Sequence, residues 1–140
     1  MARPVPAGPR AYRARIRGLG PIVALLPPVL LGALAFALLR GNASASRGVA
    51  GFVSTLFAAP VLPILGVPFR SGGAIYLGGA AASAVVWLVL GTIAARRATR
   101  VPIATWRNFW GEYAWMLVGV WGGVLLSLVA ANLVLGRALV

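Results

Sequence analysis

Four stretches of the chain carry no charged residue, and each is long enough to cross a lipid bilayer. They cover residues 18–39, 48–69, 71–95 and 113–136, which is 22, 22, 25 and 24 residues. A helix rises about 1.5 Å per residue, so about 20 residues cross a hydrocarbon core of about 30 Å. Every charged residue lies between these stretches or outside them. The pattern predicts a membrane protein with four embedded segments.

The remaining residues are too few for a separate soluble domain. Of the 140 residues, 61% are hydrophobic, and the four stretches take up 93, which leaves 47 for tails and loops. A soluble domain of this size could not bury that much apolar surface. We therefore expect an all-α membrane protein, with a basic tail at 1–20 and one transmembrane helical domain at 21–140. Its segments are expected at about 21–39, 48–69, 72–95 and 113–136.

The charge of the chain is strongly one-sided. Thirteen arginines face one acid, Glu112, which gives a net charge of +12, and the chain has no histidine or cysteine. Because the arginines flank apolar stretches, we expect them to contact anionic lipid headgroups and not nucleic acid. The residues predicted to contact headgroups are Arg13, Arg17, Arg96, Arg97 and Arg100. Abundant Arg, Ala, Gly and Pro without Lys is typical of GC-rich bacteria, so a multi-pass protein of a bacterial inner membrane is expected.

Prolines interrupt the first two stretches. Proline lacks a backbone N–H and clashes with the preceding turn, so Pro27-Pro28 predicts a kink near Leu25. The second stretch reads as a helix from 48 to 59 and then meets Pro60, Pro63 and Pro68. Three prolines within nine residues predict that the helix ends near residue 59. The remainder either crosses the membrane as a kinked segment or turns back as a re-entrant piece.

The number of arginines on each side of the membrane helps to distinguish a crossing from a re-entrant segment. Five arginines precede the first stretch, so the N-terminus is expected in the cytoplasm. Four full crossings would leave seven arginines inside and six outside, whereas a re-entrant second segment gives nine and four. The positive-inside rule favours re-entry, and the length of the stretch favours a crossing, so both topologies stay open at this point.

Two patterns surround the last stretch. Aromatic residues recur at i, i+3, i+4 and i+7, which predicts a short amphipathic helix over 105–112 in the membrane interface, before the last span. The residues expected to contact lipid or a partner there are Trp106, Arg107, Phe109, Trp110, Glu112 and Tyr113.

Small residues then follow at four-residue spacing, which lets helix backbones approach closely. The predicted helix-packing residues are Gly119, Gly123, Ser127 and Ala131, together with Gly79 and Ser83 of the third stretch.

The residues needed for catalysis are scarce. Enzymes use groups that transfer protons, attack a substrate or hold a metal, and this chain offers no His, no Cys and one carboxylate. We therefore predict no enzyme activity, no catalytic residue, no metal site and no cofactor.

The leading hypothesis is a non-catalytic accessory or assembly subunit of a larger inner-membrane complex, with other membrane-protein subunits and lipids as partners. A second is a small homo-oligomeric channel or transporter with an uncharged polar lining. A third is a lipid-associated or cell-envelope helper that binds anionic headgroups through its arginines.

Overall fold

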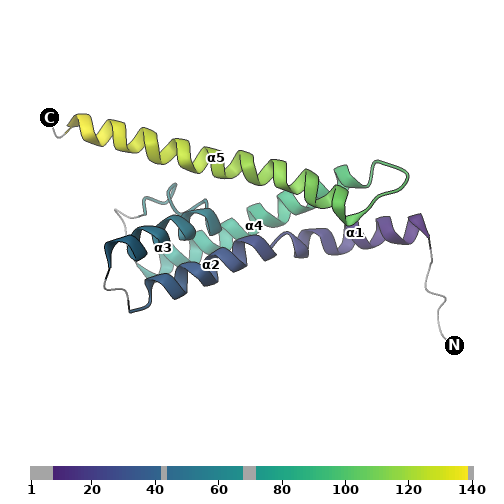
Figure 1. Ribbon diagram of the computed structural model, residues 1–140, viewed down its shortest axis with the longest axis horizontal. Helices are drawn as coiled ribbons and strands as arrows, with labels where there is room; N and C mark the ends of the chain where they lie inside the picture. The colour runs from purple at the N-terminus through teal and green to yellow at the C-terminus, as the bar shows by residue number, and fades with distance from the viewer. Residues whose placement is uncertain (1–7, 42–43, 68–71, 139–140) are drawn as a thin grey trace.

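The computed structural model describes residues 8–41, 44–67 and 72–138, and the described part of the chain is helical with no strand. The five helices are α1 (Pro9–Val23), α2 (Leu26–Leu39), α3 (Ala45–Ala58), α4 (Gly73–Ala98) and α5 (Trp106–Ala138). They form an elongated bundle in which α1 begins at one end and α5 finishes at the other (Figure 1). Pro68, Phe69 and Arg70, at the close of the expected second segment, lie outside the described residues.

Helices α1 and α2 form one long rod with a break at Ala24 and Leu25. The kink expected near Leu25 is confirmed, because Pro27 and Pro28 cannot donate to the carbonyls four residues earlier. The helix begins earlier than expected, however. Residues 1–20 were expected as a tail, but α1 begins at Pro9, since proline at the first helical position loses no hydrogen bond.

Helix α3 is short and the chain then reverses. As the prolines predict, the helix ends at Ala58, and hydrogen-bonded turns follow from Ala59 to Val67. Gly66 has a positive φ of 89°, which glycine adopts without strain. The turns run back along α4, since Ala58 lies beside Trp87, Val61 beside Ser83 and Leu62 beside Gly79. We call α3 and residues 59–67 together the hairpin.

Among the described residues, three helical stretches are long and apolar enough to span a membrane: Pro9–Leu39, Gly73–Ala98 and Trp106–Val134. Helix α3 is not one of them, because its 14 residues extend only about 21 Å. It packs antiparallel to α2, with Gly51 against Leu39 at one end and Ala58 near Gly32 at the other. The four expected segments therefore correspond to three long helices and one short one.

Helix α5 corrects the expectation of a separate interfacial helix over 105–112. The helix runs without a break from Trp106 to Ala138, through residue 113, where the last span was expected to begin. Thr105 precedes it, and its hydroxyl bonds with the Asn108 side chain at 2.7 Å, so the helix starts where the sequence indicates. No proline or glycine pair interrupts this region, so nothing forces a bend between the aromatic residues and the span.

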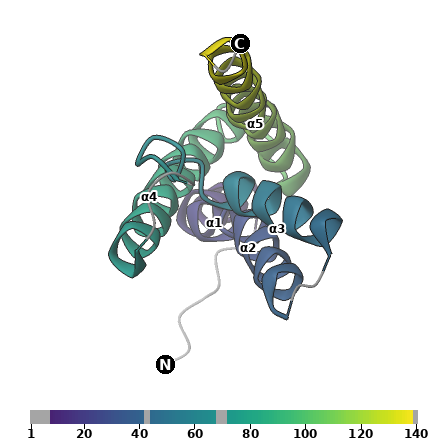
Figure 2. The ribbon, with the colours of Figure 1, turned by 90° about the vertical axis from the view of Figure 1, so that its left-hand side faces the viewer.

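The main core lies where α1, α4 and α5 cross. Small residues bring α1 and α4 together: a Cβ on Gly91 would come within 2.5 Å of the Ala24 Cβ, and one on Gly20 within 2.9 Å of the Ala95 Cβ. Aromatic side chains from α4 and α5 fill the rest, with Trp87, Phe109 and Tyr113 almost completely buried. Away from this crossing, α5 diverges from the other helices (Figure 2).

Candidate functional site

The reversal after α3 leaves backbone carbonyls without helical partners, and two tryptophans bond to them. The Trp87 indole N–H donates to the Ala58 carbonyl at 2.8 Å, and the Trp121 indole N–H donates to the Phe57 carbonyl at 3.3 Å. The last carbonyls of any helix lack intrahelical donors, and exposing them to hydrocarbon would cost several kcal/mol each. These bonds join the hairpin to both α4 and α5.

Ser83 completes this arrangement at the next turn. The Val61 backbone N–H donates to the Ser83 hydroxyl oxygen at 3.2 Å, and Ser83 is buried. One turn along α4, a Cβ on Gly79 would collide with the Leu62 side chain, so glycine leaves room for Leu62 in its present position. Gly79 and Ser83, expected as helix-packing residues, thus lie against the hairpin of the same chain.

Tyr113 makes an equivalent bond at the other proline break. Its hydroxyl donates to the Ala24 carbonyl at 2.5 Å, the group that Pro28 cannot reach because it has no N–H. Its ring stacks on Phe109 with the centroids 5.9 Å apart. Both side chains are 0% exposed. Phe109 and Tyr113, for which contact with lipid or a partner is predicted, are covered by α1 and α4 of their own chain.

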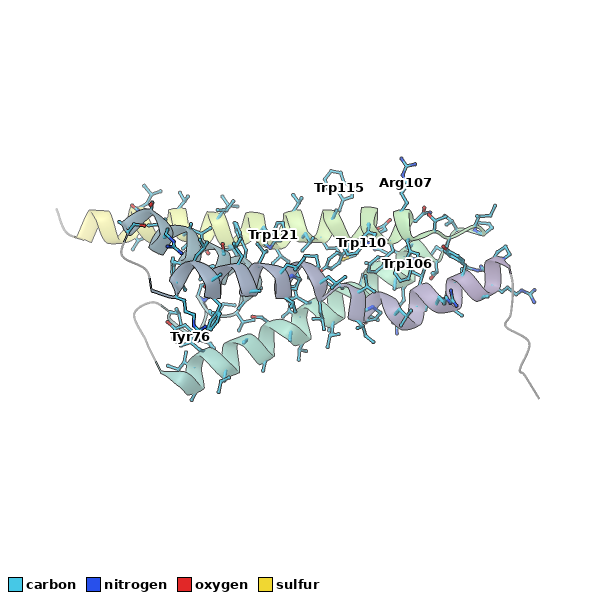
Figure 3. All side chains as sticks on the ribbon, turned by 60° about the horizontal axis from the view of Figure 1, so that its bottom comes forward. Tyr76, Trp106, Arg107, Trp110, Trp115 and Trp121 are labelled. Atoms are coloured by element: carbon cyan, nitrogen blue, oxygen red, sulfur yellow. The ribbon has the colours of Figure 1, made fainter. Side chains whose placement is uncertain are left out.

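The other aromatic residues of this stripe are less buried. Trp106 is half-buried and Trp110 is exposed, and each packs edge-on against Phe109. Arg107 and Trp115 point away from the bundle, whereas Trp121 points toward the hairpin (Figure 3). Sequence reasoning missed Trp87 and Trp121. The feature that could have identified them is their position inside apolar stretches, because a buried indole N–H needs a hydrogen-bond acceptor.

The expected ridge on α5 faces open space within this chain. Gly119, Gly123, Ser127 and Ala131 are all exposed, and a Cβ on Gly119 or Gly123 would meet no atom within 4 Å. Beside the ridge lies a groove of about 350 Å³ between α5 and the hairpin turn. Its lining residues are Pro60, Pro63, Ile64, Val120, Gly123, Val124 and Ser127. We call it the α5 groove.

A larger cavity of about 530 Å³ lies between α2, α3 and α4. Its walls are apolar side chains such as Phe36, Leu62 and Leu77, with Tyr76 among them. The Arg40 guanidinium lies over the Phe36 ring, 4.7 Å from its centroid. The hydroxyl of Thr55, another lining residue, already donates to the Gly51 carbonyl at 2.8 Å. Its lining suits a hydrocarbon chain better than a polar substrate, because it has few polar groups.

The predicted headgroup residues gather at the end of the bundle where α1 begins and α4 finishes. Arg17 Nε donates to the Thr99 hydroxyl oxygen at 2.9 Å, which links α1 to α4. Arg97 pairs with Glu112 at 3.7 Å, although Arg107 is nearer to Glu112 in the sequence. Arg96 and Arg100 are exposed beside them, and Arg13 is half-buried.

Comparison of the chain with protein families, with curated proteins and with solved structures found no match. In the described part of the chain, no three His, Cys, Asp or Glu side chains gather where a metal could bind. The features with chemical character are thus the bonded hairpin, the α5 groove and the cluster of arginines.

Proposed function

We propose that this chain is a non-catalytic accessory subunit of a larger complex in a bacterial inner membrane. In this proposal α1–α2, α4 and α5 cross the membrane, and the hairpin enters and leaves on one side. A membrane-spanning helix of a different protein packs in the α5 groove. The observation that carries the proposal is the open α5 groove, in which a Cβ added at Gly123 would meet no atom within 4 Å.

The distribution of arginines supports this topology. Eight of the described arginines lie near the end where α1 begins and α4 finishes: Arg10, Arg13, Arg15, Arg17, Arg96, Arg97, Arg100 and Arg107. Arg40 and Arg47 lie at the other end, beside the loop between α2 and α3. By the positive-inside rule, the end with eight arginines faces the cytoplasm, and so does the N-terminus.

The groove has properties that favour a helix as its occupant. Helix association in a membrane depends on close backbone packing, which bulky side chains prevent. Gly123 and Ser127 form one wall with little side-chain bulk, and Pro60 and Pro63 form the other. The occupant can approach the α5 backbone closely at Gly119 and Gly123, where an added Cβ would meet no atom within 4 Å.

Charge favours a different protein over a second copy. Two copies in the same membrane orientation would bring their arginine-rich ends together, and the single acid of each chain already pairs with its own Arg97. Like charges placed side by side at an interface are costly. A partner with acidic residues at its cytoplasmic end has no such penalty.

Site-directed cross-linking tests the proposal. The chain has no native cysteine, so Ser127→Cys carries a photo-reactive group at one position only. Ala114→Cys serves as the control, because nine residues of α5 place it about 180° around the helix from Gly123. We expect the Ser127 probe to cross-link in membranes to one different protein in a fixed ratio, and the Ala114 probe to miss it.

Two variants make the result specific to the groove. Gly123→Leu should abolish the cross-linked complex, because the side chain fills the groove. Gly136→Leu makes the same change about 140° away around α5 and should leave the complex intact. Cross-links only between copies of the chain would favour the channel hypothesis instead. Cross-links only to lipid would show that the groove faces the bilayer and would reject the proposal.

A further inference from the structure

Two pockets lined by arginines adjoin one another and share Arg17. One has a volume of about 580 Å³ and lies between α1 and α4, with Arg17, Arg96 and Arg100 among its walls. The other has a volume of about 400 Å³ and lies along α1, where Arg10, Arg13 and Arg17 line it. We call the two together the arginine site. It brings five guanidinium groups to one end of the bundle.

The fold holds this site in place. Arg17 Nε donates to Thr99, and the Thr99 hydroxyl is buried and donates in turn to the Ala95 carbonyl at 2.8 Å. The close approach of Gly20 to Ala95 sets the distance between the two helices just below. Thr99 accepts only from Nε, so it leaves the other guanidinium donors of Arg17, a residue that lines both pockets, for a ligand.

Among the described residues, no acidic side chain lines the site. The sequence holds a single acid, Glu112, and it pairs with Arg97, which lines neither pocket. Five guanidinium groups line these two adjoining pockets, and an anion placed among them would relieve the repulsion between like charges. The anion that neutralises them must therefore come from outside the chain.

The surroundings of the site indicate that this anion carries hydrocarbon. The α1–α4 pocket reaches down to Thr92 and Ala95, and the apolar side chains of Val89, Ile93 and Leu19 are exposed nearby on the same two helices. These helices are long and apolar enough to span a membrane, so their arginine-rich ends lie at headgroup depth. A phosphate group attached to acyl chains satisfies both the charged pockets and the apolar surface below them.

We propose that the arginine site binds a phospholipid with two phosphate groups, of the cardiolipin class. The two pockets share Arg17 and lie on either side of it, so each can hold one phosphate of the same headgroup. A lipid with one phosphate would leave one pocket uncompensated. Basic pockets at the cytoplasmic ends of membrane helices suit such headgroups, and binding does not depend on the partner proposed for the α5 groove.

Native mass spectrometry of the full chain in mild detergent tests the proposal. The probes are cardiolipin and phosphatidylglycerol, added together at equal phosphorus. We expect one cardiolipin per chain, with an affinity about tenfold or more above that of phosphatidylglycerol. The double substitution Arg96→Gln and Arg100→Gln should remove this preference. Both side chains are exposed, so the fold has no need of them.

The matched control is Arg40→Gln with Arg47→Gln, which removes the same charge from the other end of the bundle. It should keep the cardiolipin preference, and a loss equal to that of the first pair would mean that only net charge matters and would overturn the proposal. Equal affinity for the two lipids in the wild-type chain would also overturn it. Displacement of cardiolipin by inorganic phosphate at the same phosphorus concentration would show a free-anion site and would reject the lipid.

Discussion

The two ends of α5 contrast sharply. From Trp106 to Leu117 the helix packs into the crossing with α1 and α4, and Phe109, Tyr113 and Leu117 are buried there. From Gly119 onward, Val120 and Trp121 reach the edge of this core, and Trp121 and Val124 lie against the hairpin. Farther along, α5 diverges from the other helices (Figure 2). Aromatic residues concentrate in the first half and glycines in the second. The difference lies in whether another helix comes near enough to use the space.

The largest predicted effect belongs to the crossing of α1 and α4 that closes over the first half of α5. Gly91→Leu should destabilise the chain by about 3 kcal/mol, since overpacking costs about 1–3 kcal/mol and the new side chain meets the Pro21 backbone, which cannot move aside. Thermal unfolding of the purified chain in detergent measures this. The matched change in the open half, Gly123→Leu, should leave the unfolding temperature of the isolated chain unchanged. Equal losses from both would mean that the open half is packed as well.

The second prediction concerns the hydrogen bond from Tyr113 to the Ala24 carbonyl, at the break between α1 and α2. Tyr113→Phe removes only the hydroxyl and leaves the Ala24 carbonyl buried without its donor, which should cost about 1–3 kcal/mol. The measurement is again unfolding in detergent, with Tyr76→Phe as the control for a half-exposed tyrosine on α4. A Tyr113→Phe variant as stable as the wild type would show that another group, such as water, bonds to Ala24.

A smaller effect is expected at the hairpin. Trp121→Phe removes the 3.3 Å bond to Phe57, in the region where α5 begins to leave the bundle, and should cost about 0.5–1.5 kcal/mol. Trp87→Phe, which removes the 2.8 Å bond to Ala58 within the core, should cost more. Hydrogen exchange at residues 59–67 compares the two variants. The reverse order would place the firmer attachment of the hairpin on α5.

The smallest effect concerns the ion pair. Glu112→Gln should change stability by less than about 1 kcal/mol, because Arg97 and Glu112 are 54% and 41% exposed at their side chains and water screens the pair. Unfolding in low and high salt should show a small difference for the wild type and none for the variant. A large loss would indicate that Glu112 has a further role at this end of the bundle.

Local chemistry made part of this fold predictable. Pro27-Pro28 and Pro60 act on their own neighbours through the missing N–H, so the break near Leu25 and the end of α3 follow from the sequence. The sequence also predicts that the aromatic residues share one face of a helix. It does not predict which other helices pack against that face. Phe109 and Tyr113 are core residues because glycines in α1 and α4 let those helices close over them, and such an approach depends on the tertiary arrangement.

The side chains that donate to the freed carbonyls could not be predicted either, because they also depend on the tertiary arrangement. Tyr113 lies 89 residues from Ala24, and Trp121 lies 64 residues from Phe57. Proline shows which carbonyl loses its donor, but only the packed structure shows which side chain replaces it. The α5 groove was predictable only in part. The sequence shows the four-residue spacing of its small residues, but only the structure shows that no other helix among the described residues packs against them.

The attachment of the hairpin has a consequence for how the chain is made. Ala58 leaves the ribosome well before its donor, since Trp87 follows 29 residues later and the donor to Phe57, Trp121, follows 64 residues after its acceptor. At a synthesis rate of about 5–20 residues per second, the carbonyls wait about 1–6 s for the first indole and about 3–13 s for the second. In the proposed topology, this segment needs water or the insertion machinery beside it during that interval, so its release into the bilayer follows the synthesis of α4 and its final packing follows that of α5.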